Sequence, residues 1–393
     1  MYRNLWTKDF MFITIINFLM YIIHYALIVT VTAFTIDTFH ASEGMGGLAA
    51  GIFIIGMLFG RLFTGKYIDN LNLKKTLFIG LVFSFVAIGL YFLINSLFVL
   101  IIVRLIHGIA FGMSSTTTGT YSSTIVPEDR KGEGIGYYAL STTVASAVGP
   151  FLGIIINQNF SFESNFIVCL VCIVLAGVLA LFITNIKQPK VDEENEEIEP
   201  DKGLSQFLQK EAMPISIVVV FVGIAYSSVL AFIDSYASHI GLAAAASFFF
   251  VVYAASTFIV RPITGKIFDN YGANKVVYPV LVLFVIGLAL LSITHSSWML
   301  LFSAIFIGIG YGTILPSFQT IAIQASPTKK IGLATSTFYI FADLGAGAGP
   351  TLLGLLIGGV GYRNLYLLMA ALLVFVIVLY YFLHGRKYIT MEY

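Results

Sequence analysis

The sequence predicts an all-α integral membrane protein in which twelve transmembrane helices form two pseudo-symmetric six-helix bundles. Three observations lead to this fold class. Hydrophobic residues make up 58% of the 393 residues and charged residues only 10%, against roughly 45–50% and about 25% in soluble domains. Apolar runs of membrane-spanning length recur along the chain, and its two halves repeat each other at an offset of 200 residues. This composition excludes an ordinary cytosolic globular protein.

The apolar runs give the individual spans. A helix needs roughly 20 apolar residues to cross a bilayer core about 30 Å thick, and helices pair all their backbone groups in lipid where an open sheet cannot. The first run is longer than the roughly 7–15 apolar residues of a signal peptide, so we expect it to remain as a span. The expected spans lie near residues 10–36, 45–65, 76–94, 98–124, 133–156, 164–184, 214–237, 246–265, 276–293, 298–325, 332–356 and 365–384.

The basic residues of the short loops predict the orientation. Loops that carry Lys and Arg stay on the cytoplasmic side, and Arg363 is the one basic residue in the alternate set of loops. Both termini are therefore expected in the cytoplasm, in a multi-pass protein of the plasma membrane. The alternate loops lie near residues 37–44, 95–97, 157–163, 238–245, 294–297 and 357–364.

A polar segment separates the sixth and seventh spans. Residues 185–213 hold 8 of the 20 acidic residues, a composition typical of a solvated linker; a regulatory or partner-binding role is the alternative. The expected organisation is an N-terminal half at 1–184, an acidic cytoplasmic linker at 185–213 and a C-terminal half at 214–393.

The internal repeat supports two homologous halves. One offset aligns several separate regions, as a parallel repeat about an axis along the membrane normal would. The matched pairs are Arg61 and Arg261, Thr64 and Thr264, Gly65 and Gly265, Lys66 and Lys266, Asp69 and Asp269, Lys75 and Lys275, Gly108 and Gly308, Gly112 and Gly312, Gly149 and Gly349, and Pro150 and Pro350.

Three motifs in these regions resemble those of a known family. A Gly-x-x-x-Asp motif with following lysines begins at Gly65, Arg104 precedes a His107-Gly108 pair where the family has Gln-Gly, and Gly149-Pro150 belongs to a helix 5 pattern associated with exporters. On these residues the chain resembles the major facilitator superfamily of secondary transporters, in particular its bacterial proton-coupled exporters. The resemblance implies two bundles around a central cavity that opens alternately to each side.

The first motif and its repeat predict a cytoplasmic gate. Gly65 is expected to let the second and eleventh helices approach, and Asp69 to meet the positive start of the eleventh helix. Asp269 should do the same at the fifth helix. The alternative is that these are ordinary loop charges that obey the positive-inside rule. The expected gate residues are Arg61, Gly65, Asp69, Lys75, Arg130, Arg261, Gly265, Asp269, Lys275 and Lys330.

Two Gly-Pro pairs lie well inside predicted spans. Proline removes a backbone hydrogen bond and favours a kink, so we expect kinks at Gly149-Pro150 and at Gly349-Pro350. Each kink could act as a hinge of the gate or as a static bend, and the sequence leaves both interpretations open.

Asp343 is the most informative charge within a predicted span. A charge at a helix centre costs about 2.5–3.5 kcal/mol on insertion scales and therefore indicates a cavity, a partner or a substrate. Burial disfavours the charged carboxylate, so Asp343 is predicted to exchange protons or to bind a cationic substrate; a structural hydrogen bond is the alternative. His107, three residues from Arg104 on one helical face, is a second candidate proton carrier.

Further polar residues are predicted to line the substrate cavity. The resemblance implies that helices 1, 4, 7 and 10 form its wall, and simple interhelical hydrogen bonding is the alternative role for the residues they carry. Asp234 lies near the outer surface and fits an extracellular gate equally well. The candidates are Asn17, Tyr21, His24, Tyr25, Arg104, Tyr226, Ser227 and Asp234.

The sequence disfavours other classes of function. The six histidines form no metal-ligand or catalytic cluster, no phosphate-binding loop is present, and no basic block suits nucleic acid. Cys169 and Cys172 lie in an apolar run and are interpreted as packing thiols. We therefore expect no enzyme activity, cofactor or metal, and a monomeric proton-coupled exporter of a small organic drug or metabolite, possibly a metal-chelating one. The alternative is a proton-coupled importer of a sugar, peptide or organic acid.

Overall fold

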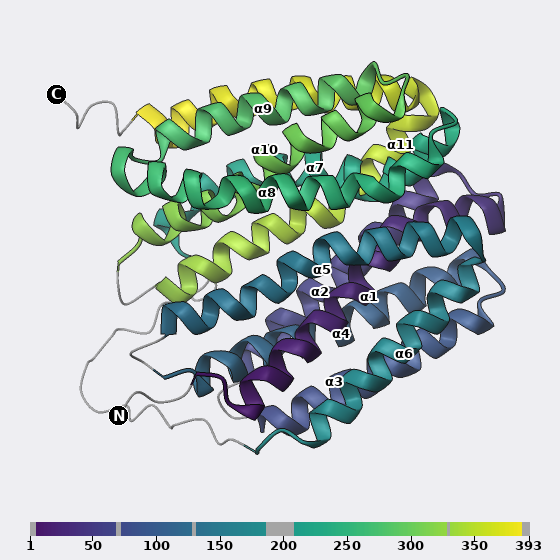
Figure 1. Ribbon diagram of the computed structural model, residues 1–393, viewed down its shortest axis with the longest axis vertical. Helices are drawn as coiled ribbons and strands as arrows, with labels where there is room; N and C mark the ends of the chain where they lie inside the picture. Colours follow the sequence, from purple (N-terminus) through teal and green to yellow (C-terminus); the bar gives the residue numbers. More distant parts are fainter. Residues whose placement is uncertain (1–4, 68–71, 128–130, 186–207, 328–330, 387–393) are drawn as a thin grey trace. The chain divides into compact units, whose positions relative to one another are not determined.

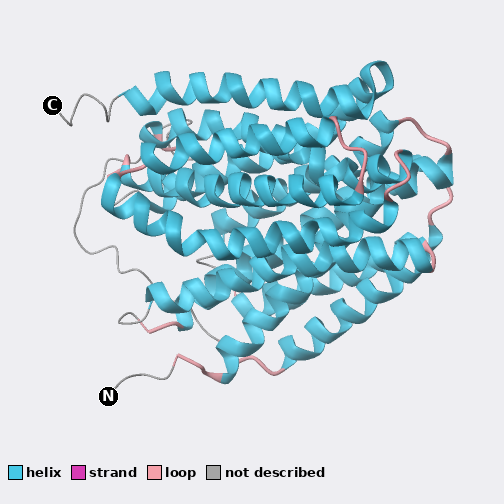
Figure 2. Ribbon diagram, turned by 45° about the horizontal axis from the view of Figure 1, so that its top comes forward, coloured by secondary structure: helices cyan, strands magenta, loops and turns pink. Residues whose placement is uncertain are grey.

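The structure, a computed structural model, describes residues 5–67, 72–127, 131–185, 208–327 and 331–386. Within these ranges the regular secondary structure is entirely helical, as predicted (Figure 2). Most of the acidic linker falls outside the described residues. The helices are α1 (Lys8–Phe39), α2 (Glu43–Tyr67), α3 (Leu73–Leu90), α4 (Leu97–Ile125), α5 (Lys131–Asn159), α6 (Phe162–Leu181), α7 (Met213–His239), α8 (Ala243–Tyr271), α9 (Asn274–Ser292), α10 (Ser297–Gln324) and α11 (Ile331–Tyr380). Short turns η2 (Tyr91–Leu93), η5 (Lys210–Ala212) and η7 (Tyr381–Gly385) adjoin them.

The last helix contains two membrane spans. A straight helix of 50 residues would be about 75 Å long at 1.5 Å per residue, more than twice the bilayer core. Gly361 interrupts it with φ 75° and ψ 165°, a conformation that glycine adopts readily. The chain reverses its direction within α11, on the side of Figure 1 where this helix is labelled. Eleven helices in the described ranges are long and apolar enough to cross a membrane, and the break at Gly361 brings this into agreement with the twelve predicted spans.

The repeat extends to the helix caps. Ser96 precedes α4 and its hydroxyl accepts a hydrogen bond from the Val99 N–H, while Ser296 precedes α10 and accepts one from Met299. The two serines are 200 residues apart. Because a capping hydroxyl pairs one of the free N–H groups of the first turn, both halves start the fourth helix of their bundle by the same chemistry.

The helices separate into two compact units. Unit 1 contains residues 1–41 and 48–193, and unit 2 contains residues 42–47 and 194–393. In unit 1, α1 packs against α4, α5 and α6, and α3 packs against α4 and α6. In unit 2, α7 and α9 pack against α11, and α10 packs against α8 and α9. The repeated sequence thus produces the same pairing of helices in each unit.

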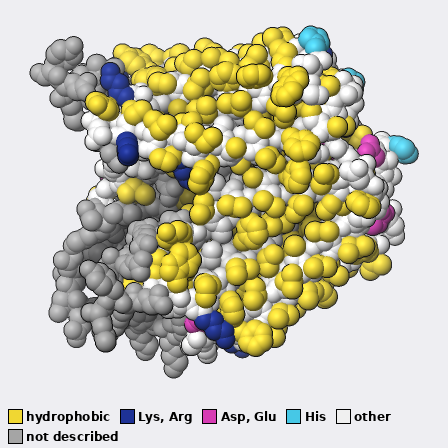
Figure 3. Space-filling view, in the orientation of Figure 1, with side chains coloured by type: hydrophobic (Ala, Val, Ile, Leu, Met, Phe, Trp, Pro, Cys, Tyr) yellow, Lys and Arg dark blue, Asp and Glu magenta, His cyan; other side chains and the backbone are white. Residues whose placement is uncertain are grey.

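Glycines allow α2 and α4 of unit 1 to touch through their backbones. A Cβ atom at Gly56 would overlap the Leu105 carbonyl, and one at Gly108 would overlap the Phe53 carbonyl. Small residues permit such contacts between membrane helices. Hydrophobic side chains dominate the face of the molecule seen in Figure 3, as a lipid-facing surface requires. Large exposed apolar side chains are common, and Phe83, for example, is 56% exposed. The predicted all-helical membrane fold is confirmed.

Candidate functional site

Arg104 is held inside unit 1 by the close contact of α2 and α4. Its side chain is fully buried. The guanidinium donates from Nε to the Ala49 carbonyl at 2.9 Å, from Nη2 to the Ala50 carbonyl at 3.4 Å and from Nη1 to the Tyr91 hydroxyl at 3.4 Å. Arg104 was expected to face the cavity. In the structure its hydrogen bonds go to oxygens of α2 and of Tyr91, and a place at the cavity stays a prediction.

His24 packs on two aromatic rings that also contact each other, with 5.5 Å between the Phe53 and Phe111 centroids. Its imidazole stacks on Phe53 from α2 at 5.0 Å and on Phe111 from α4 at 5.1 Å between ring centroids. The Phe53 ring also lies 4.6 Å from Arg104 Cζ, a cation–π distance. His24 Nδ1 is buried and has no hydrogen-bond partner among the described residues. This buried nitrogen therefore has an unused hydrogen-bonding capacity.

His107 belongs to the same group of side chains. Its Nδ1 lies 3.3 Å from the Tyr91 hydroxyl, and its ring meets Phe53 edge to face. We call His24, Phe53, Arg104, His107 and Phe111 the basic cluster of unit 1. The sequence analysis selected its three basic members, and the structure brings them together around Phe53.

Tyr21 and Tyr25 extend the basic cluster along α1. Tyr21 packs edge to face on Phe111, and Tyr25 lies 5.0 Å from His24 between centroids. Arg61 Nη2 donates to the Tyr21 hydroxyl at 3.4 Å, and both Arg61 and Arg104 are close enough to interact electrostatically with His24. Arg61, expected as a gate residue, therefore lies beside the basic cluster.

Asn17 forms a separate hydrogen-bonded hub in unit 1. Its amide nitrogen donates to Ser141 at 2.8 Å and to Thr142 at 3.0 Å, and its oxygen accepts from Tyr138 at 2.8 Å and from Thr118 at 3.4 Å. An Asn amide has two donors and two acceptor positions, so all four are occupied. Asn17 thus joins α1, α4 and α5, as in the interhelical hydrogen bonding that was the alternative to a cavity role.

Unit 2 contains a cluster of tyrosines, two of which are the repeat counterparts of Phe53 and Phe111. Tyr226 from α7 stacks on Tyr311 from α10 at 3.6 Å with an interplanar angle of 6°, and Tyr253 from α8 lies 5.9 Å from Tyr226. Asp343, half-buried on α11, interacts electrostatically with Tyr311. We call Tyr226, Tyr253, Tyr311 and Asp343 the acidic cluster of unit 2.

The two clusters use equivalent positions of the repeat. Phe53 corresponds to Tyr253, and Phe111 corresponds to Tyr311, each 200 residues later. The sequence analysis missed all four because it searched the offset for identical residues. A search for positions that are aromatic in both halves would have found them.

Ser227 and Asp234 are buried within α7. The Ser227 hydroxyl donates to the Ile224 carbonyl at 2.7 Å, and a Cβ at Gly349 would overlap it. Ser227 thus lies in the packing of α7 on α11. Asp234 is 3% exposed. Both predicted cavity residues therefore lie on α7: Ser227 is next to Tyr226, and Asp234 is near the C-terminus of the helix.

The predicted gate is only partly described. Asp69, Arg130 and Lys330 lie outside the described residues, as does the side chain of Asp269. A Cβ at Gly65 or at Gly265 would meet no atom of the described chain within 4 Å. Within the described residues, neither glycine is therefore required by a contact, and the expected approach of the second and eleventh helices at Gly65 stays a prediction.

The basic residues after the gate glycines have two different environments. Lys75 and Lys275 are exposed. Lys74, which we did not select, donates from Nζ to the carbonyls of Leu181 at 2.8 Å and Ile183 at 2.7 Å. It therefore stabilises the C-terminus of α6, where cations are favoured.

The same contact recurs at the equivalent position of unit 2. Asn274 Nδ2 donates to the Gly385 carbonyl at 2.9 Å and its Oδ1 accepts from Tyr380 at 2.8 Å. Part of the repeated loop motif thus has a structural role within each unit.

The two Gly-Pro pairs lie where helices touch within a unit. Helices α5 and α11 continue through Pro150 and Pro350. A Cβ at Gly149 would crowd Tyr25 on α1, and one at Gly349 would crowd Ser227 on α7. Each glycine allows the close contact, and the following proline leaves one carbonyl of the preceding turn without its helical donor.

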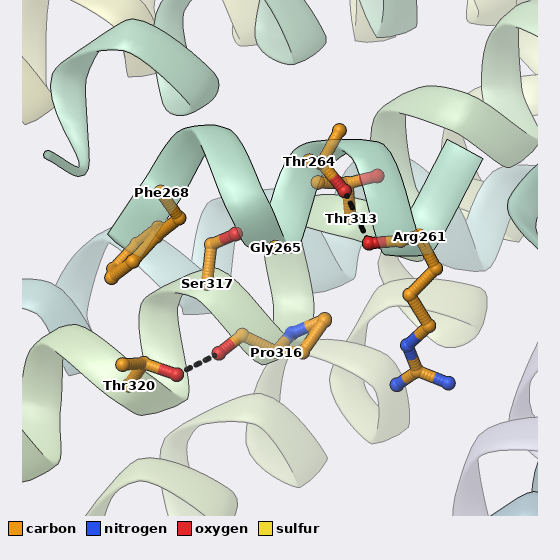
Figure 4. Close-up of a pocket in the computed structure, with 8 residues that line it drawn as sticks. All are labelled: Arg261, Thr264, Gly265, Phe268, Thr313, Pro316, Ser317 and Thr320. Carbon is orange, nitrogen blue, oxygen red and sulfur yellow. Dashed lines mark hydrogen bonds between the residues drawn. The ribbon is translucent and has the colours of Figure 1, made fainter. Parts of the chain in front are cut away.

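A pocket opens between α8 and α10 of unit 2 (Figure 4). The pocket is lined by Arg261, Thr264, Gly265, Phe268, Thr313, Pro316, Ser317 and Thr320.

Within the described residues, no group of three or more His, Cys, Asp or Glu side chains could hold a metal ion. Cys169 is buried and Cys172 half-buried, both as free thiols.

The comparisons with known proteins agree with this fold. An uncharacterized MFS-type transporter, YhhS of Escherichia coli K12, is 23% identical over 383 residues, which are 95% of this chain and 92% of that protein. The staphylopine export protein of Staphylococcus aureus is 24% identical, with 86% of this chain and 87% of that protein covered. The crystal structure of a nucleoside transporter NupG mutant has a TM-score of 0.78 at 14% identity, with coverage of 97% of this chain and 100% of that chain.

The sequence profile of the Major Facilitator Superfamily matches residues 13–291 and 243–390. These matches span both units and include the helices that carry the basic and the acidic cluster. The chain is a multi-pass membrane transporter, not an enzyme, and it belongs to the Major Facilitator Superfamily.

Proposed function

We propose that this transporter exports a small anionic or zwitterionic organic compound in exchange for protons, by alternating access. The observation that carries the proposal is the separation of charge. Cations and imidazoles gather in unit 1, and the carboxylate of Asp343 lies among tyrosines in unit 2. The transporter would sit in the plasma membrane as a monomer with both termini in the cytoplasm.

Asp343 is the proposed proton carrier. It lies twelve residues from the start of α11, at about 18 Å along the helix and therefore near mid-membrane. A half-buried carboxylate at this depth requires a compensating role. Proton exchange supplies one, because a pH difference of one unit yields about 1.4 kcal/mol per proton, and the protonated acid has no charge to stabilise.

The basic cluster is the proposed substrate-binding element. Its aromatic rings offer stacking surfaces, and His24 Nδ1 offers a free hydrogen-bonding or metal-coordinating nitrogen. Arg104 supplies positive potential beside Phe53, while three of its N–H groups donate to oxygens of the protein. This combination suits a carboxylate-bearing compound with a planar or apolar body, including a metal chelator.

The outward direction is supported by relatedness. The staphylopine export protein covers most of this chain, and the Gly149-Pro150 pair matches the exporter-associated pattern. Import of a sugar, peptide or organic acid on the same fold is the competing function. Proton coupling and direction are therefore tested together.

The test is an untargeted comparison of metabolites in cells and medium for a transporter-poor bacterial host. Wild type, Asp343→Asn and empty vector are compared at equal expression. Asp343→Asn keeps shape and hydrogen bonding but removes titration. We expect at least one compound to accumulate outside with wild type alone. Depletion of a compound from the medium would establish import instead, and export by Asp343→Asn at the wild-type pH dependence would exclude Asp343 as the proton carrier.

A further inference from the structure

The C-terminus of α6 is held by side chains from three other helices of unit 1. Lys74 of α3 donates to two carbonyls of this terminus at 2.8 and 2.7 Å. From α1, Asp9 Oδ1 accepts from the Thr184 N–H at 3.1 Å, and from α4, Tyr121 donates to the Thr184 carbonyl at 2.6 Å. The starts of α1 and α3 therefore lie beside the end of α6, at the membrane face where both chain termini are expected.

Lys8 lies at the same place, next to Asp9 in the first turn of α1. Its side chain is exposed, and its Nζ lies 5.3 Å from the centroid of the Phe12 ring and 5.5 Å from that of Phe182. Both are cation–π distances. The two rings thus hold the ammonium beside the end of α6, and contact with the face of a ring leaves N–H groups able to donate to an acceptor. We call Lys8, Phe12 and Phe182 the lysine corner of unit 1.

The potential at the lysine corner is positive. Lys74 adds a second ammonium at the same terminal turn of α6, with two of its three hydrogens used by backbone carbonyls. The adjacent carboxylate of Asp9 is occupied within unit 1, because its two oxygens accept from the Thr184 N–H and from the Tyr121 hydroxyl. The lysine corner therefore favours an anionic partner.

An exposed apolar stripe runs along α6 to the lysine corner. Its members recur every three or four residues and so share one face of the helix. They are Val171, Val174, Leu175, Val178 and Leu181, which are 44–55% exposed. Phe182, 57% exposed, ends the stripe. Figure 3 shows hydrophobic side chains over this helix. An apolar stripe that leads to a held cation fits the acyl chain and head group of a phospholipid.

Unit 2 has the stripe without the cations. Phe382, the counterpart of Phe182, is 61% exposed, and Val374 and Val378 before it are also exposed. Lys8 corresponds to Leu208, and Lys74 corresponds to Asn274. Because an apolar stripe alone does not distinguish between head groups, selectivity for anionic lipid is expected in unit 1 and not at the equivalent place in unit 2.

We propose that the lysine corner binds the head group of an anionic phospholipid, whose phosphate accepts from Lys8 while an acyl chain lies along the α6 stripe. Anionic lipids give the cytoplasmic leaflet a negative surface potential that attracts lysines near the membrane. The acidic stretch of the linker, residues 192–201, is the competing occupant, but it has few apolar residues to cover the stripe. The inference does not depend on which compound is transported.

The experiment measures lipid binding to the purified full-length protein by native mass spectrometry. Phosphatidylglycerol is compared with phosphatidylcholine of the same acyl chains, whose head group has no net charge. We expect wild type to bind phosphatidylglycerol about fivefold more tightly. Lys8→Gln removes the cation and Phe182→Ala removes a ring that holds it, so each should reduce this preference below about twofold. Both side chains are exposed, and size-exclusion chromatography confirms that each variant is folded.

Lys275→Gln and Phe382→Ala are the matched controls in unit 2, where both side chains are exposed. Each should leave the preference for phosphatidylglycerol at the wild-type value. Equal loss in Lys275→Gln, or no preference in wild type, would overturn the inference, because binding would then not depend on the lysine corner. A further variant replaces the acids of residues 192–201 by amides. An unchanged preference in it supports lipid as the occupant, whereas a preference that appears only in this variant would assign the lysine corner to the linker.

Discussion

The basic cluster of unit 1 and the acidic cluster of unit 2 occupy equivalent positions of one repeat but have opposite electrostatics. Phe53 and Phe111 both pack on His24, whereas Tyr253 and Tyr311 associate with Tyr226 and Asp343. Arg104 corresponds to Ala304, and His107 to Ile307. The comparison teaches that the repeat preserves the aromatic framework, which packs in both units, while the ionisable groups differ between the units, as the proposed division of roles in transport requires.

The largest expected effect comes from removing the cation of unit 1. Arg104→Ala leaves the Ala49 and Ala50 carbonyls without their donor and creates a cavity beside Phe53. We expect the free energy of unfolding to fall by about 3 kcal/mol, measured by thermal unfolding of the purified protein. Arg104→Lys should recover part of the loss. A stable Arg104→Ala protein would show that unit 1 needs this cation no more than unit 2, which has alanine there.

A smaller loss of stability is expected from the Asn17 hub. Asn17→Ala removes four hydrogen bonds and leaves Tyr138, Ser141 and Thr142 to find other partners. We expect a loss of about 2 kcal/mol. The counterpart of Asn17 is Ile217, so Ile217→Ala provides the matched control and should cost less than half as much. Equal losses would mean that the polar hub contributes only packing.

The next substitution separates binding from packing. His24→Phe keeps an aromatic ring against Phe53 and Phe111 but removes the nitrogen that has no hydrogen-bond partner among the described residues. We expect about tenfold weaker binding of the exported compound, equivalent to about 1.4 kcal/mol, with thermal stability close to wild type. Ile224→Phe, at the equivalent position of unit 2, tests whether an added ring alone impairs binding. Unchanged affinity in His24→Phe would exclude the imidazole from the substrate site.

The smallest effect is expected at a contact that both units make, in which a side chain donates to the last carbonyls of a helix. Lys74→Ala and Asn274→Ala each remove a donor from the terminal carbonyls of a helix. We expect losses of about 0.5–1 kcal/mol for each. Because an ammonium is involved only in unit 1, high salt should reduce the Lys74→Ala difference and not that of Asn274→Ala. The opposite salt dependence would contradict the capping role of Lys74.

The sequence by itself determined the membrane fold, the two homologous halves and most of the chemically informative residues. Long apolar runs form helices in lipid, because backbone groups must be paired within each helix. Matching residues at a single offset of 200 indicate two homologous halves. Arg104, His24, His107 and Asp343 were recognisable because ionisable groups in a span are costly and need a cause.

Only the tertiary structure decided which partners those side chains contact. Asn17 and Arg104 were assigned to the cavity from their position on a helix, yet their partners come from other helices: Ser141 and Tyr138 for Asn17, and the α2 carbonyls for Arg104. Phe53 and Tyr311 looked like ordinary apolar residues until the fold placed them against His24 and Tyr226. A single sequence states which groups a helix carries, but the distance and direction to a partner on another helix arise only when the helices pack.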